Sequence, residues 1–283
     1  MNHERRIGRN ALWVLLGLMA WLPLASTCIW AADVPQPAAT NDFNAYVERV
    51  ESRLAGQHQS QAGFLAGPGL DSGTNAETRG RLRRGETIIE NLGAGSESSI
   101  PGAMLHHWRG TAFVPGAHLG DFERLMKDFN AYPQHFSPEI LAARLVSQHD
   151  NNGVDRITAS MRVKQKHVLT VVMDMTYDVA FTRLDAQHGY SISHSTRIEE
   201  IDSAGTSKER ALSPKEEHGF LWRLNTYWSY AEGDGGLYMQ IETVSLTRAI
   251  PTGLGWAIKP YVESVPRESL EFTLRTAENL LRR

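Results

Sequence analysis

The clearest hydrophobic pattern in the chain lies in residues 167–184, where apolar and polar side chains alternate. Asp174, Thr176 and Asp178 stand at every second position. Between and beyond them lie Met173, Met175, Tyr177, Val179 and Phe181. Alternation of period two is typical of a β-strand with one dry and one wet face. We therefore expect a long strand whose apolar set lines the dry side of a sheet.

Similar β-rich segments surround this strand. They lie at 86–92, 104–114, 141–149, 154–164, 190–201, 219–231 and 237–247. The Asn152-Gly153 pair is a strong signal for a tight hairpin turn, and the glycine-rich residues 232–236 connect the last two segments. Strands joined by such short turns pair antiparallel. A polar loop is expected at 202–218.

Helical spacing of apolar residues appears in three places. Residues 42–54 place them on one face of a short helix, and residues 117–130 repeat them every three or four positions. The closing helix is expected to begin near Pro266, because proline suits a first helical turn. Its buried stripe comprises Leu270, Leu274, Ala277 and Leu281. Residues 256–258 are expected to form a lead-in turn, kinked by Pro260.

The first 32 residues have the layout of a secretory signal peptide. Three arginines precede the apolar run 11–25, and the small residues Ala31 and Ala32 follow it. We expect export to the periplasm or the medium. The alternatives are an uncleaved N-terminal anchor and a lipoprotein anchored through Cys28, whose preceding residues fit a lipoprotein signal poorly.

Composition narrows the function. The net charge of −3 disfavours a nucleic-acid partner, which would normally meet a basic surface. Cys28 is the only cysteine. A chain cleaved after it has no disulfide, no thiol nucleophile and no thiolate metal site. The mature chain is expected to lack a membrane span.

Residues 33–100 are predicted to be a partly flexible N-terminal extension. Residues 56–80 are rich in Gly, Ser, Gln, Asn and Thr, and the basic cluster 79–84 is expected to be a solvated turn. The main domain is expected to span 101–283.

The order of elements in 101–283 is a strand, two short helices, a run of antiparallel strands and a long helix. With the closing strand and helix at 236–283, it resembles the START/Bet v 1-like superfamily (SRPBCC), which includes polyketide cyclases and lipid-transfer domains. Within that superfamily, the HHWRG segment at 106–110 and the GFLWRLNTYW segment at 219–228 resemble exported bacterial members. The resemblance implies an α+β helix-grip fold, a curved antiparallel sheet wrapped around a C-terminal helix. It also implies a cavity that often holds hydrophobic ligands. It carries over no site residues.

Candidate ligand contacts follow from strand facing. Alternation places Trp222, Trp228 and Tyr230 on one face of 219–231, either lining a cavity or packing beneath the closing helix. The full set of candidates is Met173, Met175, Tyr177, Phe181, Trp222, Trp228, Tyr230, Trp256, Leu270, Arg109 and Glu242. An alternative turns Arg223 inward, paired with Glu242. Which faces of 219–231 and 237–247 point inward stays open.

His106 and His107 are neighbours on a strand, so their side chains point to opposite faces and do not share a metal ion. One of them, with Arg109, could face the cavity. An enzyme of the cyclase/dehydratase kind would use such a histidine with Arg109 or Glu242 to move protons.

Common catalytic signatures are absent, including the nucleophile elbow, the phosphate loop and the HExxH motif. The first hypothesis is therefore an exported protein that binds a hydrophobic or amphipathic small molecule, such as a lipid. It needs no cofactor and no metal. The second is the cyclase/dehydratase enzyme, and the third is a non-catalytic envelope scaffold whose residues 33–100 recruit a partner.

Overall fold

The computed structural model describes residues 34–60, 63–67, 76–93, 99–166, 170–250 and 255–282, with no side chains for 76, 99 and 255–263. These described residues form one compact unit. The expected signal peptide at 1–32, including Cys28, lies outside the described residues. None of the helices in the described ranges has the length and apolarity that crossing a membrane requires.

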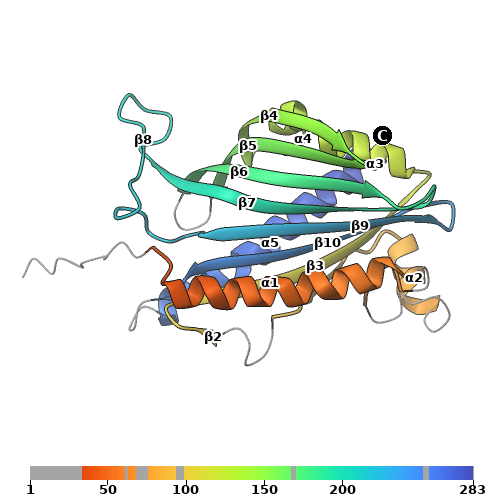
Figure 1. Ribbon diagram of the computed structural model, residues 1–283, viewed down its shortest axis with the longest axis horizontal. Helices are drawn as coiled ribbons and strands as arrows, with labels where there is room; N and C mark the ends of the chain where they lie inside the picture. Colours follow the sequence, from red (N-terminus) through yellow and green to blue (C-terminus); the bar gives the residue numbers. More distant parts are fainter. Residues whose placement is uncertain are drawn as a thin grey trace, which may run out of the picture. The chain divides into compact units, whose positions relative to one another are not determined.

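The centre of the molecule is an antiparallel sheet in the order β1-β3-β10-β9-β7-β6-β5-β4, with β2 paired to β3 and β8 to β7 (Figure 1). The strands are β1 Ile88–Asn91, β2 Ser99–Ile100, β3 Ala103–Pro115, β4 Ile140–Asn151, β5 Val154–Lys166, β6 Thr170–Arg183, β7 His188–Asp202, β8 Arg210–Ala211, β9 Arg223–Gly233 and β10 Gly236–Arg248. The turn between β4 and β5 has positive φ at Asn152 and Gly153, as the sequence predicted. The predicted α+β fold class is confirmed.

Helix α5, Gly255–Leu281, packs on one face of the sheet, which we call the inner face (Figure 1). Gly110 of β3 allows the close approach, because a Cβ there would lie 2.7 Å from Leu270 Cδ2 and 2.9 Å from Leu274 Cδ2. The helices α3, Leu119–Lys127, and α4, Tyr132–His135, with the 3-10 turn η2, Phe129–Ala131, complete this layer. The main core lies between this layer and the sheet.

Helix α1, Pro37–His58, covers the opposite, outer face. Its buried residues pack against Leu105 of β3, Tyr227 of β9, and Val244 and Leu246 of β10. The described part of the expected N-terminal extension therefore belongs to the same packed unit as the sheet, to which it also adds β1 and β2.

The ends of several elements differ from the sequence prediction. Helix α1 is longer than 42–54, and the basic cluster 79–84 belongs largely to helix α2, Ala76–Arg83, instead of a turn. Helix α5 begins at Gly255 and continues through Pro260 and Pro266, so neither proline marks its start. Strand β9 begins at Arg223 instead of residue 219.

Candidate functional site

A cavity of about 390 Å³ lies between the inner face of the sheet and α5. Its walls come from strands β4, β5, β6, β7, β9 and β10, from α5, and from the α3–η2–α4 segment. Small-molecule sites are typically roughly 300–1,000 Å³ and mostly apolar. The volume is therefore large enough for a small hydrophobic molecule.

Most of the apolar candidates from the sequence line this cavity. They are Met173, Met175, Tyr177, Phe181, Trp228 and Leu270. The four residues of β6 reach it because every second side chain of that strand is buried on the inner face. The structure brings this set together around one space, while binding of a ligand by it stays a prediction.

Three aromatic candidates lie elsewhere. Tyr230 is on the inner face but packs beneath α3, where its hydroxyl donates to Glu123 at 3.1 Å. Trp222 precedes β9 and packs in the outer cluster under α1, so strand alternation does not apply to it. Trp256 lies in α5, and its side chain is outside the described part of the structure.

Arg109 and Glu242 are not in the cavity lining, because both lie on the outer face beside α1. The Glu242 carboxylate accepts hydrogen bonds from His107 Nε2 at 3.0 Å and from Arg53 Nη2 at 2.5 Å. Arg109 Nη1 lies 3.6 Å from its other oxygen and Arg109 Nε donates to Glu90 at 2.9 Å. We call these five side chains the outer charge cluster. The proposed pairing of Arg223 with Glu242 is wrong, because their register partners are Leu246 and Tyr227.

Burial alone would raise the pKa of Glu242, but the hydrogen bond from His107 and the charge of Arg53 outweigh it and hold that pKa below its ordinary value. Glu242 is thus a buried carboxylate. His107 Nδ1 lies 2.8 Å from the Tyr46 hydroxyl, so the ring is held from both sides. This arrangement ties α1 to the sheet. It does not present proton-transfer groups to the cavity.

His106 points to the inner face, where its Nε2 lies 3.1 Å from Thr247 Oγ1. His107 points outward, so the predicted opposite facing of the two rings is confirmed. Within the described ranges, no cluster of three His, Cys, Asp or Glu side chains could hold a metal ion.

The sequence reasoning missed the polar side chains of the cavity. Glu139, Gln165 and Ser269 lie in its lining, and Gln165 Nε2 donates to Ser269 Oγ at 3.0 Å and to Glu139 at 3.4 Å. Burial raises the pKa of Glu139 to about 7, assisted by the nearby charge of Glu268. The only sign of this polar group in the sequence was a glutamate beside the predicted second short helix. A single glutamate forms no pattern that would indicate a cavity.

The free energy of unfolding is expected to fall as the pH rises from about 4.5 to about 7, through the titration of Glu139. A carboxyl whose pKa is raised on folding binds its proton more tightly in the folded state. Its stabilisation is therefore complete below the unfolded pKa and is lost as the pH passes the folded pKa. We expect about 1 kcal/mol, since part of the carboxyl stays solvated. Urea denaturation at pH 5 and pH 7.5 measures it, and Glu139→Gln should remove this component of the slope.

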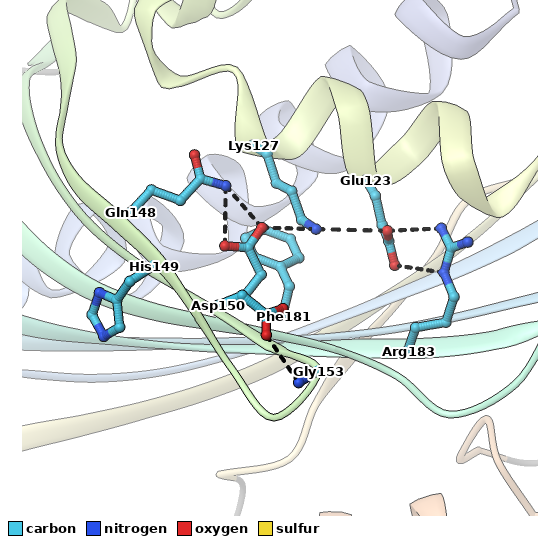
Figure 2. A pocket seen from close by; sticks show the side chains of 9 residues that line it. Glu123, Lys127, Gln148, His149, Asp150, Gly153, Phe181 and Arg183 are labelled. Carbon is cyan, nitrogen blue, oxygen red and sulfur yellow. Dashed lines mark hydrogen bonds and ion pairs between the residues drawn. The ribbon is translucent and has the colours of Figure 1, made fainter.

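A second hollow, of about 460 Å³, lies on the surface where α3 meets the turn between β4 and β5 (Figure 2). Two ion pairs lie in its lining: Lys127 with Asp155 at 3.1 Å, and Arg183 with Glu123 at 2.8 Å. Phe181 lines both this hollow and the inner cavity. The ion pairs link α3 to strands β5 and β6.

No protein-family model and no curated protein matches the chain. Among solved structures, a START superfamily protein from Mycobacterium smegmatis is similar at 15% identity and a TM-score of 0.38, over 62% of this chain and 96% of that one. Human STARD10 is similar at 7% identity and a TM-score of 0.44, over 88% of this chain and 83% of that one. The Zhui aromatase/cyclase from Streptomyces sp. R1128 is similar at 12% identity and a TM-score of 0.40, over 63% of this chain and 94% of that one. Likenesses this weak carry no argument about ligand or reaction.

The strand order, the long helix on the inner face and the cavity between them make up a helix-grip fold, the architecture that the sequence resemblance implied. The fold supplies the cavity. Its side chains, and not the fold, have to identify what the cavity accepts.

Proposed function

We propose that the chain is an exported protein that binds a hydrophobic or amphipathic small molecule between the sheet and α5. The observation that carries the proposal is the cavity itself, about 390 Å³ of space with mostly apolar walls. Side chains usually fill such a space in a protein core, because interiors pack as densely as organic crystals. A cavity of this size and lining matches small-molecule sites.

Export is part of the proposal and is supported by residues 1–32 alone. Their basic start, apolar run and small residues have the composition of a signal peptide. The intact mass of the chain recovered from an envelope fraction tests it. A chain shortened by about thirty residues supports export and cleavage, whereas a full-length chain in the cytosolic fraction contradicts both.

The uncharged dye Nile red tests binding, since its fluorescence rises in an apolar site. The wild-type protein is expected to bind it, and Leu224→Trp to weaken binding about tenfold or more by placing an indole in the cavity. Leu141→Trp is the matched control, because Leu141 is 43% exposed on β4. Equal binding by the wild type and Leu224→Trp, with both folded by circular dichroism, would place the dye elsewhere and reject the cavity as the site.

A cyclase/dehydratase-like enzyme is the alternative, and Glu139 favours it. A carboxyl with a pKa near 7 inside an apolar cavity is suited to general acid–base catalysis. Molecules that co-purify with the protein should be extracted and incubated with fresh wild type or with Glu139→Gln. Recovery at unchanged mass in both supports a carrier, and a loss of water seen only with the wild type supports the enzyme.

A further inference from the structure

Hydroxyl groups form a row across the floor of the cavity. Ser193 of β7 is the register partner of Thr226 of β9, which is in turn the partner of Thr243 of β10. All three line the cavity. Ser191 and Ser245 also line it, each two residues along its strand and on opposite sides of the row. Five hydroxyls on three strands therefore face one space.

These hydroxyls have no hydrogen-bond partner within the part of the chain that the structure describes. Ser191 is 2% exposed and Ser245 is 4% exposed, whereas Ser193, Thr226 and Thr243 are half-buried. Polar groups withdrawn from bulk water normally have a hydrogen-bond partner. What occupies the cavity, a ligand or ordered water, supplies the partner here.

The charge of the lining restricts what that occupant is. The described lining residues include no Lys, Arg or His, and Glu139 carries the one carboxyl group among them. A carboxylate or phosphate on a ligand would find no counter-charge, and burying it unpaired would be costly. A hydroxyl group can both donate and accept a hydrogen bond, so it matches an alcohol or a carbonyl without any charge.

We propose that the cavity selects uncharged apolar molecules that carry a hydroxyl or carbonyl oxygen, and that this oxygen binds the row Ser193–Thr226–Thr243. The inference rests on the proposed function and adds the ligand class. The oxygen of an alcohol lying on the row can donate to one hydroxyl and accept from another. The hydrocarbon part then contacts the methionine and aromatic walls of β6 and β9.

Displacement of Nile red by three ligands of equal chain length, 1-dodecanol, dodecane and dodecanoate, tests the selection. The wild type is expected to prefer 1-dodecanol over both others by about tenfold, the equivalent of one or two net hydrogen bonds. The triple variant Ser193→Ala, Thr226→Val, Thr243→Val should lose the preference over dodecane. Its affinity for dodecane should be kept or raised, which also shows that its cavity is intact.

Thr176→Val is the matched control, because Thr176 lies on the outward-facing side of β6. It should keep the preference for 1-dodecanol. The inference is overturned if the wild type binds dodecane or dodecanoate as tightly as 1-dodecanol, or if the triple variant keeps the full preference. Either result, with Nile red still bound and still weakened by Leu224→Trp, leaves the proposed function standing. Absence of Nile red binding would instead reject the proposed function.

Discussion

Glu242→Gln is expected to lower the free energy of unfolding by about 3 kcal/mol. The Glu242 side chain is 2% exposed and lies against two guanidinium groups and the ring of His107. A glutamine has the same shape but removes the negative charge, which leaves Arg109 buried with only Glu90 beside it. Breaking a buried ion pair from one side costs more than the pair contributes, because the remaining charge loses its compensation.

Urea denaturation at pH 7 measures the loss, and Glu216→Gln is the matched control. Glu216 also accepts hydrogen bonds from an arginine, Arg210, at 2.8 and 2.9 Å, but it is nearly half exposed. We expect at most about 1 kcal/mol there. Limited proteolysis should also cut α1 of Glu242→Gln faster, because Arg53 of α1 loses its ion pair with the sheet. Similar losses in both variants would show that the outer charge cluster does not hold α1.

The contrast between β6 and β10 explains how much of the site the sequence could predict. Strand β6 has one buried and one solvated face, so its alternation alone was enough to identify the inner residues. Strand β10 is buried on both faces, since α5 lies on one and α1 on the other. Its outer residues Val244 and Leu246 are more apolar than its inner residues Thr243 and Ser245. Hydrophobicity alone therefore does not identify the inner face of this strand, which the sequence left open.

Two further misses have local causes. Trp222 was assigned to the cavity by extending strand alternation beyond Arg223, where the strand begins. The start of α5 was placed at Pro266 because proline favours a first turn, whereas the helix runs through it. A proline removes one helical hydrogen bond, and packing along a 27-residue helix can tolerate that loss. Both facts depend on tertiary packing that one sequence does not encode locally.

The hydroxyl row was invisible for a related reason. Serine and threonine are common on solvated strand faces, so their residue type alone does not indicate that Ser193, Thr226 and Thr243 line a cavity. Only the register across β7, β9 and β10 shows that they lie side by side and face the cavity. The fold class could be predicted from the order of elements, but the chemistry of the cavity depended on strand pairing.

Gly110→Val is expected to lower the free energy of unfolding by about 3 kcal/mol and to weaken Nile red binding. Its first added carbon would lie 2.7 Å from Leu270 Cδ2 and 2.9 Å from Leu274 Cδ2. Both leucines are buried in the core, at 2% and 0% exposed, so they have little room to move. Helix α5 has to shift away from β3, and because α5 forms a wall of the cavity, the shift reaches the ligand site.

A double-mutant cycle with Leu274→Ala separates this steric cause from a general effect of the new side chain. Leu274→Ala alone should cost about 2–5 kcal/mol through the space it leaves. The double variant Gly110→Val, Leu274→Ala should lose less free energy of unfolding than the two single variants together, since the valine partly fills the space that Leu274 leaves. Gly120→Ala on α3, where an added Cβ meets nothing within 4 Å, should be neutral or stabilising. Additive losses in the Gly110 and Leu274 pair would mean that α5 does not rest on Gly110.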